Sequence, residues 1–70
     1  MTDINRIKVV LAEEKRTSLW LSQQLGVNRT TVSKWCTNTN QPDLHTLVRI
    51  ADLLKVDVSD LLNKTLKENV

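Results

Sequence analysis

The sequence predicts an all-α domain of five helices, formed by residues 1–70 as a single unit with its core between residues 4 and 62. Three observations support this prediction. Apolar residues recur at intervals of three and four, which is the spacing of a buried helix face. Residues that favour helix N-caps precede several of these stretches. The single glycine and the single proline both stand between predicted helices, where one element ends before the next begins.

The first helix is expected to begin after Asp3, a good capping residue, and to end near Lys15 and Arg16. Cations suit the end of a helix because the helix dipole is negative there. These two cations could touch a DNA phosphate or remain solvated, and Lys8 is expected to face water. The buried stripe expected for this helix consists of Ile4, Ile7, Val10 and Leu11.

The second helix is expected to be capped by Thr17 and to bury Leu21 and Leu25, which lie one turn apart on one face. Gly26 should end it, because glycine adopts the left-handed conformation without a steric penalty. Trp20 cannot share the direction of the two leucines, so it is expected to point outward. Two interpretations stay open for it: packing over neighbouring side chains, or anchoring a partner protein.

The third helix is expected to be capped by Asn28 and to end at Trp35 or Cys36. Val32 and Cys36 share its inner face. The opposite, outer face carries two cations and several hydroxyls but no acid. The residues on or beside this outer face are Arg29, Thr30, Thr31, Ser33 and Lys34.

This outer face indicates a function. From Lys15 to Gln41 the chain has no acidic residue. Residues 1–42 hold six cations and three acids, whereas residues 43–70 hold four cations and five acids. Cations and hydroxyls on an exposed helix can contact base edges and phosphates in a DNA major groove. Residues 17–35 therefore indicate a helix-turn-helix whose second helix enters that groove, with a plain polar helix in a small bundle as the alternative.

The second half of the chain should complete the bundle. Residues 37–42 have turn chemistry, and Asn38 is expected to adopt a positive φ. Asp43 and Asp57 should cap the fourth and fifth helices. The fourth helix is expected to present a broad apolar face of Leu44, Leu47, Val48, Ile50, Ala51 and Leu54. An apolar stripe on the fifth helix consists of Val58, Leu61, Leu62 and Leu66. Part of this stripe should seal the core, and the rest could self-associate.

Several classes of protein are disfavoured. The single cysteine, Cys36, cannot form an intrachain disulfide, so a reducing compartment and a cytoplasmic location are expected. No apolar run is long enough for a signal peptide or a membrane span. His45 has no partner at metal-binding spacing, Cys36 has no positioned base, and one glycine cannot form a phosphate loop. We therefore expect no enzyme activity, no metal and no cofactor.

The run LSQQLGVNRTTVSKW, followed by Pro42 and LHTLVRIADLLKVDVSDLL, resembles the Cro and phage-repressor type of helix-turn-helix, the XRE family. The resemblance covers residues 4–62 without a gap. It implies a five-helix, lambda-repressor-like domain that binds DNA operators as a homodimer. By this resemblance, the base-reading positions are Arg29, Thr30 and Lys34. The phosphate-binding positions are Thr17, Ser18, Thr31, Thr37 and Asn38, to which we add Ser33 beside the outer face.

The chain departs from the family pattern in several places. Before the second helix, Lys15 and Arg16 stand where the family often has a glycine and an apolar residue. Leu11 stands where the family commonly has an arginine, and Cys36 stands where it has the glutamate that pairs with that arginine. Replacing both partners of an ion pair by apolar residues leaves no charge unpaired, so Leu11 and Cys36 are expected to touch. The loop after the third helix also lacks the usual cations, which predicts few ionic phosphate contacts and a shallow salt dependence of binding.

Together these features predict a sequence-specific, DNA-binding transcriptional regulator. It is expected to repress by binding a palindromic operator in double-stranded DNA as a homodimer, joined through the fifth-helix region. One alternative is an antitoxin-like or other protein-binding module with secondary DNA contact. Its only support in the sequence comes from Trp20 and the apolar stripe of the fifth helix. Another is a scaffold that hides the outer face of the third helix in an oligomer.

Overall fold

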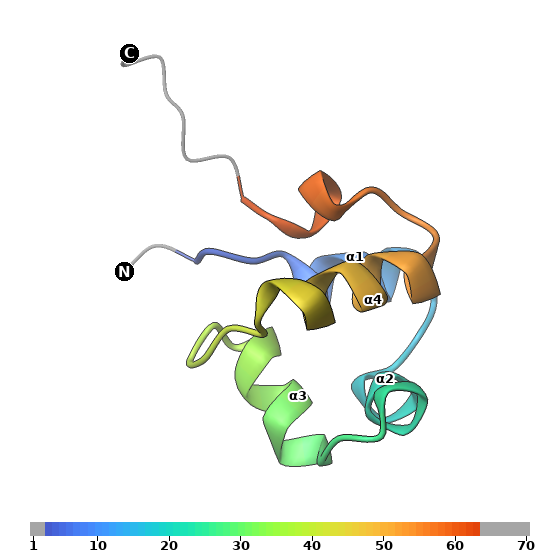
Figure 1. The fold of residues 1–70 in the computed structure, drawn as a ribbon, viewed down its shortest axis with the longest axis vertical. Coiled ribbons are helices and arrows are strands. Elements are labelled where there is room, and N and C mark those ends of the chain that lie inside the picture. The colour runs from blue at the N-terminus through green and yellow to red at the C-terminus, as the bar shows by residue number, and fades with distance from the viewer. Residues whose placement is uncertain (1–2, 64–70) are drawn as a thin grey trace.

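Four α-helices and one 3₁₀ turn surround a common core in the computed structural model, which describes residues 3–63 (Figure 1). The described elements are α1 (Ile7–Glu13), α2 (Ser18–Leu25), α3 (Arg29–Cys36), α4 (Leu44–Leu54) and the 3₁₀ turn η1 (Val58–Leu61). Residues 3–63 contain an isolated antiparallel bridge but no β-strand. None of the described helices has the length and apolar character needed to cross a membrane. The all-α prediction is therefore confirmed.

The predicted ends of the second and third helices are confirmed by their caps. The Thr17 hydroxyl accepts a hydrogen bond from the Trp20 backbone N–H at 3.0 Å, and the Asn28 side chain accepts one from Thr30 at 2.8 Å. Each bond satisfies an N–H that has no partner within its own helix. Gly26 ends α2 with a φ of 71°, which would strain any residue that carries a Cβ.

Asp43 caps α4 as predicted, because its carboxylate accepts a hydrogen bond of 2.8 Å from the Thr46 backbone N–H. Bonds from the Thr46 side chain and backbone hold the pKa of the exposed Asp43 carboxyl below its usual value. A second cap stands at η1, where Asp57 and Asp60 bond each other's backbone N–H groups in a capping box. Both predicted caps in this half of the chain are thus confirmed.

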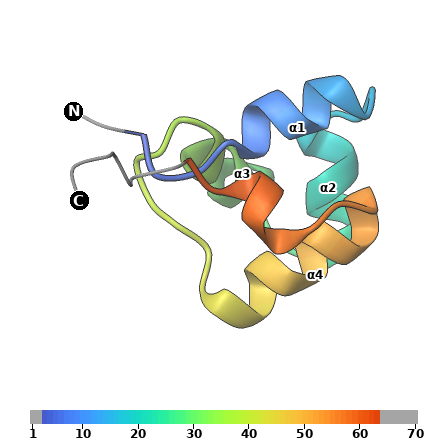
Figure 2. The ribbon, with the colours of Figure 1, turned by 90° about the horizontal axis from the view of Figure 1, so that it is seen from above.

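The prediction that the first helix begins after Asp3 is wrong. The helix begins at Ile7, because the Asn5 side chain accepts a hydrogen bond from the Ile7 backbone N–H at 2.9 Å. Residues 3–6 instead run antiparallel to residues 61–63, and Asn5 forms a bridge with Leu62 (Figure 2).

The prediction that Ile4 belongs to the buried stripe of the first helix is also wrong, because its side chain is 53% exposed. The backbone of Ile4 is fixed from both sides. Its carbonyl accepts a hydrogen bond from Asn63 at 2.9 Å, and its N–H donates to the Asn38 side chain at 2.8 Å. These bonds hold the residue in the extended segment ahead of α1.

The fifth helix is reduced to the single turn η1, so the predicted count of five helices is not confirmed. Leu62 is already extended, with φ −116° and ψ 143°. The Leu61 carbonyl accepts a hydrogen bond from the Arg6 backbone N–H at 2.8 Å, and this bond belongs to the pairing of the two end segments. Leu61 is fully buried and seals the core, whereas Leu62 is 38% exposed. Leu66 lies outside the described residues.

The apolar face of α4 is narrower than predicted. Leu44 is 76% exposed and Val48 is 53% exposed, contrary to the prediction that both belong to the apolar face in the core. They lie four positions apart on one flank of the helix, which no other described element covers. The buried residues of α4 are Leu47, Ile50, Ala51 and Leu54, as predicted.

The core draws on all five elements. Trp35 joins it from α3 with only 7% of its side chain exposed, while Cys36 is half-buried. The prediction that Val32 faces inward is confirmed. The buried hydrophobic residues are Ile7, Val10, Leu11, Leu21, Leu25, Val32, Trp35, Leu47, Ile50, Ala51, Leu54 and Leu61.

Candidate nucleic-acid interface

α2, a short turn and α3 form the predicted helix-turn-helix. The chain leaves α2 at Gly26 and enters α3 after Asn28, so only three residues separate the two helices. Buried side chains from both helices, Leu21 and Val32 among them, hold the pair together. Ser22 is also buried, and its hydroxyl donates to the Leu19 carbonyl at 2.8 Å. The small side chain leaves room for the close approach of a neighbouring helix.

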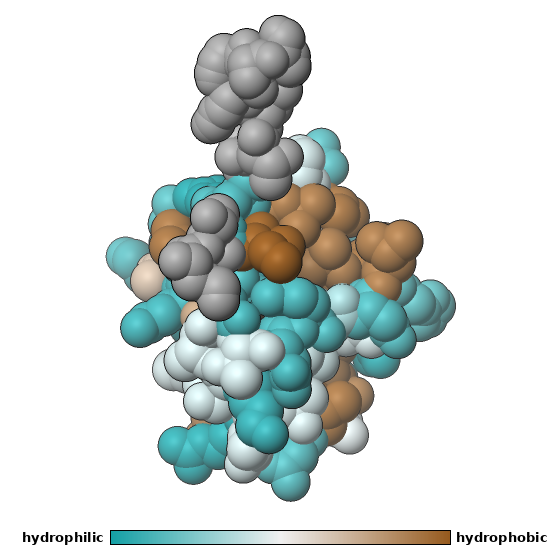
Figure 3. Space-filling view, turned by 90° about the vertical axis from the view of Figure 1, so that its left-hand side faces the viewer, coloured by the Kyte–Doolittle hydropathy of each residue, from teal (hydrophilic) through white to brown (hydrophobic). Residues whose placement is uncertain are grey.

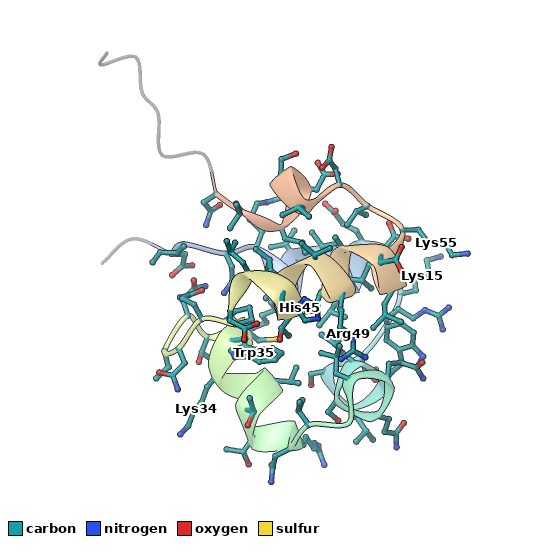
Figure 4. All side chains as sticks on the ribbon, viewed as in Figure 1. Lys15, Lys34, Trp35, His45, Arg49 and Lys55 are labelled. Carbon is teal, nitrogen blue, oxygen red and sulfur yellow. The ribbon has the colours of Figure 1, made fainter. Side chains whose placement is uncertain are left out.

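The outer face of α3 is open to solvent. Arg29, Thr30, Ser33 and Lys34 are exposed, and Thr31 is half-buried. Figure 4 shows Lys34 pointing away from the body of the domain. Among the described residues, the one ion pair joins Arg6 and Glu13 at 3.7 Å, so neither cation of this face is neutralised by a described acid. The three predicted base-reading residues therefore lie on one accessible surface.

A hollow of about 360 Å³ opens between α1, the start of α2 and the end of α3. Three of the six predicted phosphate-binding residues line it, namely Ser18, Ser33 and Thr37, whereas Thr17, Thr31 and Asn38 do not. The other lining residues are Lys8, Leu11, Ala12, Arg16 and Cys36. The lining thus combines two cations and three hydroxyls with an apolar floor, and it contains no carboxylate.

Leu11 and Cys36 both belong to this floor. Cys36 packs against the core cluster that contains Leu11, while direct contact between the two side chains stays a prediction. Burial raises the pKa of the Cys36 thiol, and the nearby charge of Lys8 acts in the opposite direction. Cys36 is therefore a neutral, half-buried side chain at neutral pH. The described residues contain no group of three His, Cys, Asp or Glu that could hold a metal ion.

The comparisons with known proteins agree with this geometry. The family model of the Cro/C1-type HTH DNA-binding domain matches residues 6–65. The chain belongs to this family. It is also similar to a candidate DNA-binding protein from Bacteroides fragilis whose crystal structure is known, with 53% sequence identity and a TM-score of 0.85. That similarity covers 86% of this chain and 97% of the other. A comparison with curated proteins finds no match.

The resemblance found in the sequence is therefore confirmed. As a Cro/C1-type HTH domain, the chain is a DNA-binding domain.

In this Cro/C1-type domain, Asn38 has a structural role that its sequence position did not reveal. Its side-chain oxygen accepts hydrogen bonds from the Ile4 and Asn5 backbone N–H groups, each at 2.8 Å, and its amide donates to the Asn5 carbonyl at 3.2 Å. The predicted positive φ is confirmed at 60°. Both polar ends of the side chain are thus engaged in holding the N-terminal segment against the loop after α3.

Trp20 packs over its neighbours, which was the first of the two open interpretations. The ring is half-buried against the core, and the Arg16 guanidinium lies 4.5 Å from the ring centroid. A cation over an aromatic face gains electrostatic attraction.

Proposed function

We propose that this chain is a sequence-specific transcriptional repressor that binds a palindromic operator as a homodimer. The observation that carries the proposal is the outer face of α3, where exposed Arg29, Thr30 and Lys34 have no described acid beside them. A cationic and hydroxyl-bearing helix held outward by a helix-turn-helix suits the major groove. Repression would follow from occupation of a promoter. Residues 1–70 act as one DNA-binding unit in this proposal.

The proposed contacts divide into two kinds. Arg29 is placed at the start of α3, where its guanidinium can donate two hydrogen bonds to one guanine. Lys34 and Thr30 would contact neighbouring bases on the same face. The phosphate contacts are assigned to Thr17, Ser18, Thr31, Ser33, Thr37 and Asn38. Because the Asn38 side chain already bonds Ile4 and Asn5, it would act mainly by keeping the loop in place.

Selection of bound sequences from random duplexes at a stated salt concentration tests the proposal. Recovery of a two-fold-symmetric site is the expected result, because a symmetric dimer places two α3 helices about 34 Å apart in successive major grooves. Failure to enrich any sequence, with no binding to duplex DNA even at low salt, would contradict it.

Arg29→Ala should abolish the preference for one base pair in each half-site. The expected loss of discrimination is about 1–3 kcal/mol, which corresponds to a factor of roughly 5–150 between the preferred base and its competitors. Repeating the selection with the variant measures it directly. Arg49→Ala serves as the matched control, since Arg49 is an exposed arginine on α4 outside the helix-turn-helix. An unchanged preference in the Arg29 variant would remove this residue from the base-reading set.

The dimer is assigned to the C-terminal side of the domain. Figure 3 shows apolar side chains concentrated in the upper part of the molecule, whereas the lower part is mostly hydrophilic on that face. The exposed large apolar residues of the described C-terminal half are Leu44 and Val48 of α4 and Leu62 after η1. Burial of such side chains on both copies would favour association. This surface replaces the fifth helix as the proposed site of pairing.

Val48→Glu is expected to weaken this dimer at least tenfold, because the side chain would be buried twice in a symmetric interface and each burial stabilises by about 1.5–3 kcal/mol. Sedimentation equilibrium measures the change. Val9→Glu is the control, since Val9 is an exposed valine on α1. Equal association constants for the two variants would rule out this face. A wild-type chain that stays monomeric on its operator would favour a partner protein on the same surface.

A further inference from the structure

The hollow between α1, α2 and α3 contains two cations that the sequence pattern does not assign to DNA. Lys8 is predicted to face water, and Arg16 is compatible with either solvation or phosphate contact. Both line the hollow together with the hydroxyl-bearing residues Ser18, Ser33 and Thr37. The five side chains come from three separate parts of the chain, so their proximity is a property of the fold.

The position of Arg16 is fixed by two contacts. Its backbone N–H donates to the Leu11 carbonyl at 2.8 Å, and its guanidinium lies over the Trp20 ring. Stacking uses the flat face of the guanidinium and leaves the N–H groups along its edge available to an anion. A cation that is already ordered loses less side-chain entropy when it binds.

Lys8 contributes the second charge from α1. It is exposed, and it lines the hollow together with Cys36. Glu13, on the same helix, forms its ion pair with Arg6 rather than with Lys8. Within residues 3–63, no carboxylate lines the hollow. The residues that line the hollow beside Lys8 thus supply hydroxyls, a second cation and apolar groups, but no acid.

We propose that Lys8 and Arg16 hold one backbone phosphate of the DNA in this hollow, with hydroxyls of Ser18, Ser33 or Thr37 as further donors. A nucleotide backbone unit carries an anionic phosphate beside an apolar deoxyribose. Lys8 and Arg16 would pair with the phosphate, and the apolar side chains of Leu11 and Cys36 would contact the sugar. The inference rests on the proposed function. It adds an ionic contact from Lys8, which the sequence placed in solvent, and chooses phosphate binding over solvation for Arg16. The salt dependence of binding is then steeper than the loop composition implies.

The salt dependence of operator affinity tests the role of Lys8. In Lys8→Gln, the slope of log K against log salt should fall by about 1.8, because each of the two protomers loses one phosphate contact worth about 0.9, while base preference stays unchanged. Fluorescence anisotropy on the selected duplex gives both quantities. Lys55→Gln is the matched control, because Lys55 is an exposed lysine that does not line the hollow.

A second measurement identifies the phosphate. Each phosphate of the duplex is replaced in turn by a neutral methylphosphonate. One replacement should weaken wild-type binding but leave Lys8→Gln unaffected, because the partner charge is already gone. If no position shows this coupling and the two lysine variants have the same slope, the inference is overturned. Loss of base preference in Arg29→Ala would still support the proposed function in that case. No binding of the wild type to any duplex would instead contradict the proposed function itself.

Discussion

Replacing Trp35 with alanine should lower the free energy of unfolding by about 3–5 kcal/mol, the usual cost of removing a buried tryptophan. Only 7% of this side chain is exposed, and it fills the core at the end of α3. Small domains hold only about 5 kcal/mol or somewhat more in total. The variant should therefore be largely unfolded at room temperature. Urea denaturation followed by circular dichroism measures the loss.

The other tryptophan provides an internal control. Trp20 is half-buried and stacks with Arg16 at the surface, so Trp20→Ala should cost much less than Trp35→Ala. Trp35→Phe keeps an aromatic ring in the core and should retain a measurable unfolding transition. An equal loss in the free energy of unfolding for Trp35→Ala and Trp20→Ala would contradict the central position of Trp35 in the core.

Asn5→Ala is expected to cost about 3 kcal/mol, although the residue is polar. Its buried side-chain amide donates to the Trp35 carbonyl at 2.9 Å and to the Gln41 side chain at 2.6 Å. Its side-chain oxygen accepts from the Ile7 N–H. Alanine would leave the Ile7 N–H without a partner and would remove one of the bonds to the Trp35 carbonyl, which keeps its bond from the Asn38 N–H. A buried unsatisfied group costs about 1–3 kcal/mol. The thermal midpoint should fall by roughly 12–24 °C, measured by calorimetry.

The control for this variant is Asn40→Ala in the loop after α3. Asn40 is exposed, and its side chain makes no hydrogen bond within residues 3–63. Its replacement should change stability by no more than about 0.5 kcal/mol. A cost for Asn5→Ala as small as that of the control would mean that the buried network contributes little.

Features fixed by neighbouring residues could be predicted from the sequence. The caps at Thr17, Asn28 and Asp43, the end of α2 at Gly26, and the positive φ of Asn38 all depend on local chemistry. Each of these signals acts within about one helical turn. This is why the amino-acid order alone suffices to locate the helix-turn-helix.

Features fixed by distant residues were predicted wrongly. The start of α1 and the loss of the fifth helix both follow from the pairing of Asn5 with Leu62, which are 57 positions apart. The exposure of Leu44 and Val48 depends on which elements cover α4. Periodicity identifies an apolar flank but does not tell whether another element packs on it.

The candidate site also contains one part that is fixed by neighbouring residues and one part that is fixed by distant residues. The outer face of α3 is a local pattern, and its exposed cations Arg29 and Lys34 were predicted. The hollow needs three helices to form, so the place of Lys8 beside Ser33 and Thr37 could not be predicted. The inward bonds of the Asn38 side chain likewise depend on residues 33 and 34 positions away.

The pairing of residues 3–6 with residues 61–63 indicates where the chain could be circularly permuted. The Asn63 side chain donates to the Asp3 carbonyl at 2.8 Å, so the two segments already meet. A short peptide linker between them would close the backbone into a ring without passing over α3. New termini would then be better opened in the turn around Lys55 than in the loop after α3, because that loop contains Asn38 and Gln41, which bond Asn5. Circular permutants that are opened at the turn around Lys55 should keep α3 in position.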